Sequence, residues 1–233
     1  MTSLLLLSGG PDHAHDFPVT CSSIVDVLEQ GGANVTVVNE PDQAAEMLSG
    51  SFDALVIHAL RWRMLHDRYE PWRAQWGYHT SADTRAAISG YVRAGGGLVG
   101  MHTASICFDD WPEWRDVLGG AWNWERSSHP PVGRVSASVV EAAAGHPAMM
   151  PGLRGLDLVD EVYGDLDMAP GVEALMVARR TPDDELQPVV WAHQYGDGRV
   201  WYDGFGHDAV SVRSPHHAAL LRHGVEWVTG GAR

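Results

Sequence analysis

The stretch Gly95-Gly96-Gly97-Leu98-Val99-Gly100-Met101-His102-Thr103-Ala104 joins a helix stop, a short apolar run and a polar turn. The three glycines are typical of the end of a helix, which we expect over residues 81–94. Residues 98–101 are predicted to form a buried strand, and His102 follows on the turn that leads into the next helix. Because several classes of α/β enzyme present their reactive residue on such a turn, we expect the chemistry of this chain to be built around His102.

The segments on both sides of this stretch alternate between strand and helix patterns. In the first half we expect strands at 3–8, 34–38, 54–57 and 98–101 and helices at 20–30, 41–48 and 81–94. In the second half we expect a short helix at 111–118, strands at 132–140, 156–159, 173–178, 189–193 and 199–202, and a closing helix at 214–229. The alternation predicts an α/β fold with a mainly parallel, doubly wound sheet that antiparallel strands extend. No linker or repeat interrupts the pattern, so we expect a single domain over residues 1–233.

The composition excludes several classes of protein. The chain has 233 residues, a formal charge of −14 and no lysine. The negative charge argues against a nucleic-acid partner, and the missing lysine excludes Schiff-base chemistry and the phosphate-binding lysine of nucleotide hydrolases, so no nucleotide cofactor is expected. We find neither a signal peptide nor the roughly 20 consecutive apolar residues of a membrane span, and expect a cytoplasmic protein with no membrane partner. Thirteen histidines and ten tryptophans favour a site for a polar small molecule.

Residues 59–80 form an aromatic-rich stretch in which no regular element is expected. Its aromatic residues include Trp62, Tyr69, Trp72, Trp76, Tyr78 and His79. A loop of this length inside one domain is either a lid or binding loop, or a segment packed over the edge of the sheet. Both interpretations are open.

Histidines follow the predicted ends of four strands. His13 and His15 come after the first strand, His58 after the third, His102 after the fourth and His207 after the last. Because ligands of doubly wound sheets bind at the carboxyl ends of the strands, we expect these side chains to meet. Such a cluster either binds a divalent ion, with zinc as the first choice, or performs acid–base chemistry without a metal.

Carboxylates for such a site are available at the end of another predicted strand. The segment Asp160-Glu161-Val162-Tyr163 either supplies a carboxylate to the histidines or forms a solvated turn. Cys21 and Cys107 are too few for a disulfide framework, and both are expected to be small buried residues. Cys107 also lies five positions beyond His102, off the turn, which argues against a cysteine nucleophile.

Taken in order, the motifs of the chain resemble those of ThuA-like proteins, a family named for trehalose utilisation. The matching segments cover nearly the whole chain. They are Gly95–Ala104; Trp111 with Leu118-Gly119-Gly120-Ala121-Trp122; His146-Pro147 to Gly152-Leu153; Asp160–Tyr163; Pro188–Tyr202; Gly206-His207; and Gly224-Val225-Glu226-Trp227. The N-terminal loop, residues 9–16, matches the glycine–histidine start of the family only approximately.

The resemblance implies a flavodoxin-like or class I glutamine amidotransferase-like fold without the usual nucleophilic cysteine, and a role in the catabolism of oxidised (3-keto) glucosides. It implies an active site whose catalytic residues are His102, Glu161 and His207 and whose metal ligands are His13, His58, His102 and His207. We expect the substrate to contact Trp62, Trp111, Asp160 and Tyr163.

Three functional hypotheses follow. The first is an enzyme that acts on a sugar by metal-assisted or histidine-driven proton transfer, in an elimination, isomerisation or hydrolysis, without amidotransferase activity. The second is a non-catalytic sugar-binding or regulatory module that uses its tryptophans for stacking. The third, a cysteine-dependent hydrolase using Cys107, is the weakest. In each case the partner is a small-molecule sugar, and we expect a homodimer.

Overall fold

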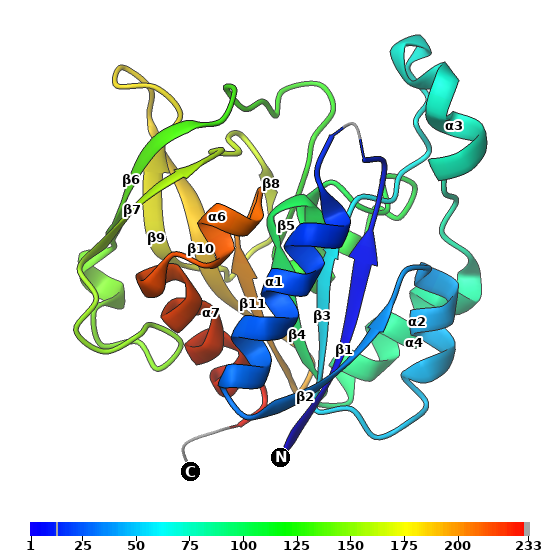
Figure 1. Cartoon of the computed structure of the whole chain (residues 1–233), viewed down its shortest axis with the longest axis horizontal. Helices are drawn as coiled ribbons and strands as arrows, with labels where there is room; N and C mark the ends of the chain where they lie inside the picture. The colour runs from blue at the N-terminus through cyan, green and yellow to red at the C-terminus, as the bar shows by residue number, and fades with distance from the viewer. Residues whose placement is uncertain (13, 231–233) are drawn as a thin grey trace.

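The computed structural model describes residues 1–12 and 14–230, and its centre is a nine-stranded sheet with the order β2-β1-β3-β4-β11-β10-β9-β6-β7 (Figure 1). Five strands are parallel: β1 (Thr2–Gly9), β2 (Ala33–Val38), β3 (Ala54–Ala59), β4 (Gly97–Met101) and β11 (Gly198–Asp203). Strands β3 and β4 are buried along their whole length. Their continuous apolar sequences reflect this burial, because helices cover both faces of a parallel sheet.

Antiparallel strands extend the sheet beyond β11, as the sequence predicts. They are β10 (Leu186–Tyr195), β9 (Glu173–Arg179), β6 (Gly133–Val139) and β7 (Gly155–Asp160). A tight hairpin joins β10 and β11, and its first central residue, Gly196, has a φ of 63°. A glycine with positive φ at that position is typical of a tight type II′ turn, whose twist suits a hairpin.

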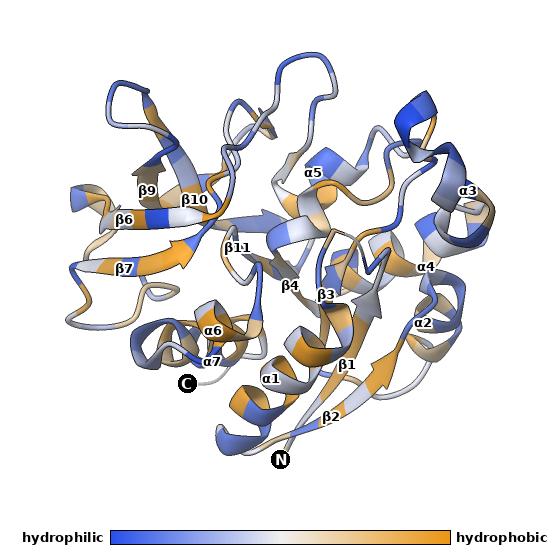
Figure 2. Cartoon of the chain, turned by 45° about the horizontal axis from the view of Figure 1, so that its top comes forward, coloured by the Kyte–Doolittle hydropathy of each residue, from blue (hydrophilic) through white to orange (hydrophobic). Residues whose placement is uncertain are grey.

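Helices cover both faces of the sheet and create two apolar cores. One face carries α1 (Phe17–Gln30), α6 (Ala209–Val212) and α7 (Pro215–Val228); the other carries α2 (Pro41–Met47), α4 (Ala82–Arg93) and α5 (Trp114–Leu118). Along β1, Leu4 and Leu6 face the first core and Leu5 and Leu7 the second. Figure 2 shows that α1 and α2 carry both apolar and polar residues, as helices on a sheet face must. No helix of the described residues is long and apolar enough to cross a membrane.

The structure corrects several expected elements. Residues 59–80 are not irregular throughout, since they contain a 3₁₀ turn η1 (Asp67–Tyr69) and the helix α3 (Glu70–Trp76). Helix α1 begins at Phe17 instead of residue 20, because the side chain of Asp16 caps it by accepting a hydrogen bond from the Val19 amide at 3.2 Å.

Other differences concern short elements and strand ends. Strand β3 runs through His58 to Ala59, and the helix expected at 111–118 begins only at Trp114. The two-residue strands β5 (Gly120–Ala121) and β8 (Asp167–Met168) pair with each other, and the 3₁₀ turns η2 (His102–Ser105) and η3 (Glu141–Ala143) complete the elements. Pieces this short carry too few residues for a periodic pattern.

Candidate functional site

The turn after β4 holds His102 in an uncommon backbone conformation. His102 has a φ of 44°, is fully buried and starts the 3₁₀ turn η2. A non-glycine residue in this region costs of order 1–3 kcal/mol and is found most often at functional sites. Strand β4 is tightly packed against α5 just before the turn, since a Cβ added at Gly100 would lie 2.5 Å from Leu118 Cδ1. The predicted sharp turn is therefore present.

Hydrogen bonds fix the tautomer of the His102 ring. Nδ1 lies 2.9 Å from the carbonyl oxygen of Gly204, so Nδ1 carries the proton and donates it. Nε2 is left with a lone pair, and the Tyr163 hydroxyl lies 3.0 Å from it and donates to it. This arrangement, in which one ring nitrogen bonds a backbone carbonyl and the other faces a polar cluster, is typical of histidines that bind metals or carry protons.

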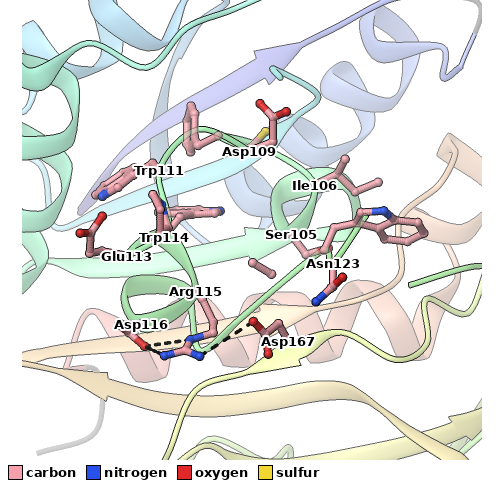
Figure 3. Close-up of a pocket in the computed structure, with 15 residues that line it drawn as sticks. Ser105, Ile106, Asp109, Trp111, Glu113, Trp114, Arg115, Asp116, Asn123 and Asp167 are labelled. Carbon is pink, nitrogen blue, oxygen red and sulfur yellow. Dashed lines mark hydrogen bonds and ion pairs between the residues drawn. The ribbon is translucent and has the colours of Figure 1, made fainter. Parts of the chain in front are cut away.

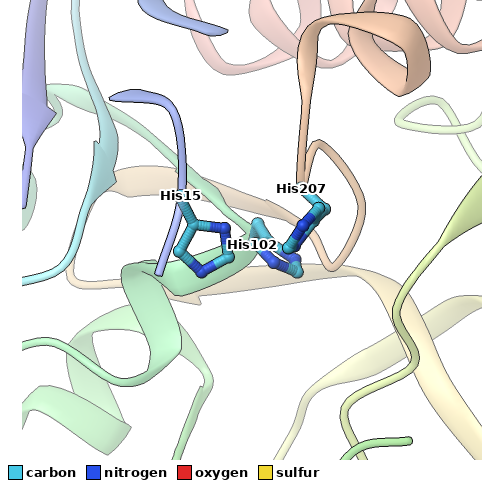
Figure 4. Close-up of side chains that lie close together, drawn as sticks. All are labelled: His15, His102 and His207. Carbon is cyan, nitrogen blue, oxygen red and sulfur yellow. The ribbon is translucent and has the colours of Figure 1, made fainter. Parts of the chain in front are cut away.

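Three histidines from different strand ends, His102 among them, lie close together (Figure 4). His15 follows β1, His102 follows β4 and His207 follows β11; each offers one ring nitrogen, and these nitrogens lie within 4.8 Å of one another. The ring of His15 packs edge-on against the other two, with centroid distances of 5.1 Å to His102 and 4.5 Å to His207. Burial first, and then these two neighbours, lower the pKa of His15 to about 2, so its ring is neutral.

Glu161, directly after β7, brings a carboxylate to the same cluster. Its Oε2 lies 3.5 Å from His102 Nε2 and 3.4 Å from His207 Nδ1, and its Oε1 lies 3.2 Å from His129 Nδ1. Burial alone would raise the pKa of this carboxyl, but the contacts with the three histidines outweigh burial and hold the pKa well below its usual range. The segment 160–163 is thus not a solvated turn, and Glu161 is ionised.

His129 joins the site from the loop between β5 and β6, and no sequence signal predicted it. Its hydrogen bond to Glu161 raises its pKa, while burial opposes this. Burial lowers the pKa of His207, but the negative charge of the nearby Glu161 carboxylate outweighs burial and raises it. The site therefore combines an ionised carboxylate with imidazoles that differ strongly in basicity.

The structure changes the expected set of metal ligands. His13 lies outside the described residues, and His15, which was not among the expected ligands, lies in the cluster. His58 is not one of the three clustered histidines; its Nε2 donates to the carbonyl oxygen of Gly206 at 3.0 Å and so supports the loop that carries His207. Burial, followed by the proximity of His102, lowers the pKa of His58 to about 3.

Two buried carboxylates hold the loop after β11 that supplies Gly204, Gly206 and His207. Asp160, predicted as a substrate contact, accepts from the Gly206 amide at 2.9 Å and lies behind the loop with an exposure of 1%. Asp203 accepts from the Phe205 amide at 3.1 Å and pairs with His217 Nε2 at 2.8 Å. Both carboxylates bind this loop from within the protein.

The pair of His217 with Asp203 is structural in character, although a serine lies beside it. His217 Nδ1 donates to the carbonyl oxygen of Ser211 at 2.8 Å, and Nε2 donates to Asp203. Burial lowers the pKa of His217, but Asp203 raises it more, to about 9. A ring that donates from both nitrogens is an imidazolium and cannot act as the base for Ser211.

A cavity of about 230 Å³ opens from the histidine cluster and is walled by aromatic rings. Its lining includes Glu161 and Tyr163, with Trp62, Trp122 and Trp124 around them. The rings of Trp62 and Trp124 lie nearly parallel, 20° apart with centroids at 6.4 Å. Trp62 also packs into a small apolar cluster with Phe17, so residues 59–80 contribute both to the cavity and to packing.

Two other predicted residues lie away from this cavity. Trp111 is among the lining residues of a separate cavity, where it packs beside Trp114 with ring centroids 5.4 Å apart. The Cys107 thiol donates to the carbonyl oxygen of Ala59 at 3.0 Å, and burial raises its pKa to about 12. A protonated, buried thiol is a poor nucleophile, which argues against the hypothesis of a cysteine-dependent hydrolase using Cys107.

Fold and site define an α/β protein with a histidine–carboxylate cluster at the carboxyl edge of a doubly wound sheet. The family model described as "ThuA: Trehalose utilisation" matches residues 3–228, and the chain belongs to this family. Membership links the chain to carbohydrate metabolism. No curated protein matches it.

Solved structures share this fold at low sequence identity. A ThuA-like protein from Parabacteroides merdae has 19% identity and a TM-score of 0.77, with 99% of this chain and 90% of that chain covered. A ThuA-like protein from Bacteroides uniformis has 19% identity and a TM-score of 0.69, with 97% and 91% covered. A β-galactosidase from Rahnella sp. R3 has 17% identity and a TM-score of 0.63, with 100% of this chain and 32% of that chain covered.

Proposed function

We propose that this protein is an enzyme of carbohydrate catabolism that acts by proton transfer on a glucoside with a carbonyl group at C3, or on a related sugar. The family's description supports a sugar substrate. The observation that carries the proposal is the contact of the ionised Glu161 with three imidazoles beside an aromatic-lined cavity. Amidotransferase activity is not part of the proposal, because His102 occupies the turn on which a nucleophilic cysteine would stand.

The residues present suit the chemistry of a 3-keto sugar. The C3 carbonyl acidifies the hydrogen on C2, and Glu161 is the carboxylate placed to accept that proton. The electron pair of the C2–H bond forms the enolate, and expulsion of the glycosidic oxygen from C1 completes an elimination. His129, whose pKa is raised and which is partly exposed, would give a proton to the departing oxygen. Addition of water to the product would turn the elimination into a net hydrolysis.

The same cluster also fits a divalent metal ion, with zinc as the first choice. Within residues 1–12 and 14–230, His15 Nδ1, His207 Nδ1 and Glu161 Oε2 are buried without a hydrogen-bond partner. The ring nitrogens offered by His15, His102 and His207 lie within 4.8 Å of one another, so a single zinc ion can contact all three. We propose His15, His102 and His207 as its ligands, which leaves one coordination position open and leaves Glu161 free to act as the base. When bound, the ion supplies Lewis-acid stabilisation of negative charge on a substrate oxygen.

Hydrogen exchange at C2 tests the proposal. In D₂O, the wild-type protein should replace the C2 proton of methyl 3-keto-glucoside by deuterium. Proton NMR measures this exchange as the loss of the C2 proton signal. Glu161→Gln should lower the exchange rate by about 10²–10⁴-fold, the usual contribution of a general base. Glu173→Gln, which changes an exposed carboxylate that pairs only with His146 among the described histidines, is the matched control and should exchange like the wild type.

The outcomes separate the two remaining hypotheses. Exchange that is equally fast in Glu161→Gln would refute the role of this carboxylate. A wild-type protein that binds the sugar but neither exchanges C2 nor cleaves the glycosidic bond would be the non-catalytic binding module.

A further inference from the structure

A second cavity, drawn in Figure 3, has a volume of about 360 Å³. It adjoins the cavity at the histidine cluster. The two share a wall, because Ile106 and Trp122 line both. The Trp122 amide donates to the carbonyl oxygen of Ser105 at 2.8 Å, which fixes this wall to the turn that carries His102. On the side of the first cavity, the Trp122 ring lies 5.3 Å from that of Tyr163. The two spaces are therefore neighbours across a single aromatic side chain.

The lining of the second cavity combines fixed aromatic rings with planar polar groups. Trp111 packs against Trp114, whose Nε1 donates to the carbonyl oxygen of Ala104 at 3.0 Å. Asn123 and the pair of Arg115 with Asp116 lie opposite these rings (Figure 3). Trp111 and Trp114 are only 5% and 1% exposed and form the floor of the cavity, so the half-buried Trp122 is the ring that can pack on the apolar C–H face of a sugar. The amide, carboxylate and guanidinium groups around it can bond hydroxyls.

We propose that the second cavity is a binding subsite for an uncharged sugar unit attached to the one that reacts at the histidine cluster. This rests on the proposed function. The volume of the first cavity, about 230 Å³, is below the roughly 300–1,000 Å³ of pockets that hold a complete small-molecule ligand. One sugar ring fits such a space, and the adjoining 360 Å³ accommodates a second.

The charges of the second cavity select against phosphorylated sugars. Its lining has carboxylates at Asp109, Glu113, Asp116 and Asp167 but one guanidinium, Arg115. Arg115 is already bound, with its Nη2 2.8 Å from Asp116 Oδ1 and its Nη1 3.9 Å from Asp167 Oδ2. A phosphate would meet carboxylates without a free cation to pair with, which is unfavourable.

The test compares one sugar unit with two in the same exchange reaction. Methyl 3-keto-glucoside reaches only the first cavity, whereas the 3-keto derivative of trehalose reaches both. We expect the wild-type kcat/KM for C2 exchange to be about tenfold higher for the trehalose derivative, as one or two added contacts would give. Ala121→Phe, which fills the second cavity, and Glu113→Ala, which removes a polar group from it, should reduce this preference to about two-fold and leave the rate on the methyl glucoside unchanged.

Each result has a distinct meaning. Equal kcat/KM values for the two sugars in the wild type, or variants that slow both sugars equally, would overturn the subsite while the proposed function stands. A 6-phosphate of the trehalose derivative that reacts better than the unphosphorylated compound would overturn the assignment of an uncharged unit. Failure of the wild type to exchange even the methyl glucoside would refute the proposed function itself, and the subsite with it.

Discussion

At the scale of single residues, His102 shows how a strained position is kept in place. Its φ of 44° is unfavourable, yet its carbonyl oxygen accepts from the Tyr202 hydroxyl at 2.7 Å and its Nδ1 donates to Gly204. The first contact fixes the backbone at His102, and the second fixes the orientation of its ring. Nε2 therefore faces Tyr163 and Glu161 although the backbone conformation is strained.

Removal of the Tyr163 hydroxyl tests this description of the ring. Tyr163→Phe keeps the buried ring but leaves His102 Nε2 without its donor, so we expect the free energy of unfolding to fall by about 1–2 kcal/mol in urea denaturation. C2 exchange should slow as well, because the orientation of His102 is less well fixed. Tyr195→Phe, on the β10–β11 hairpin, is the control for exchange and should not change its rate. An exchange rate that is unaffected in Tyr163→Phe would contradict the role of this hydrogen bond.

The sequence predicted some site residues and missed others for identifiable reasons. His102 follows directly from the strand and turn, and Glu161 from a strand end. His15 was not predicted as a ligand although a local signal was available: Asp16 caps α1 and Pro18 lies in its first turn, which places His15 directly before the helix. His129 belongs to a loop with no periodic pattern, so only the folded chain brings it to Glu161.

At the scale of elements, the loop after β11 depends on the buried pair of His217 with Asp203. A histidine whose pKa is raised on folding stabilises the folded protein fully below its ordinary pKa of 6.5, and this contribution is lost as the pH rises through about 9. The change from 6.5 to about 9 corresponds to about 3 kcal/mol. The loop that carries His207 should therefore loosen in mildly alkaline solution.

The prediction compares unfolding at pH 6.5 and pH 9. In urea denaturation, the free energy of unfolding of the wild type should fall between pH 6.5 and pH 9. This fall should be larger than that of His217→Gln by about 3 kcal/mol, because the variant has no imidazolium to deprotonate. His223→Gln, on the same helix but exposed, should behave like the wild type. The interpretation fails if His217→Gln retains the full pH dependence.

Strand β4 supplies a second prediction at this scale. Gly100→Ala places a Cβ 2.5 Å from Leu118 Cδ1 and 3.2 Å from Tyr202 Cδ2, so we expect a loss of about 1–3 kcal/mol of stability from overpacking. Gly90→Ala, in α4 with no atom within 4 Å of the added Cβ among the described residues, should instead stabilise by about 0.5–1 kcal/mol. Thermal unfolding measures the difference in stability between the two variants. A Gly100→Ala variant as stable as the wild type would show that β4 is not tightly packed against α5.

At the scale of the whole molecule, the parallel half of the sheet follows from the sequence more completely than the rest. Continuous apolar strands and capped helices are local signals, and the observed elements lie within a few residues of those expected. The pairs β10–β11, β9–β10 and β6–β7 join strands that are neighbours in the sequence, but the pairs β6–β9 and β4–β11 join distant segments, and no local pattern encodes them. The helix α3 was missed because its seven residues are rich in tryptophan and too few to show a period.

The topology explains why the site lies where it does. β1, β4, β7 and β11 belong to different parts of the chain, yet the residues that follow them, His15, His102, Glu161 and His207, meet at one place. In a doubly wound sheet the carboxyl ends of the parallel strands share an edge, and the antiparallel extension brings β7 back to it. The site is a property of the whole fold and of no single motif.

Metal stoichiometry tests this convergence most directly. The protein, loaded with zinc and freed of excess metal, should hold about one zinc per chain by elemental analysis, because three clustered imidazoles can form the protein ligands of a catalytic zinc site. We expect His15→Ala, His102→Ala and His207→Ala each to lose the zinc, and His129→Ala, which contacts Glu161 but is not among the three clustered histidines, to retain it. Zinc that stays bound in His102→Ala, or a wild-type protein that binds none, would contradict the account.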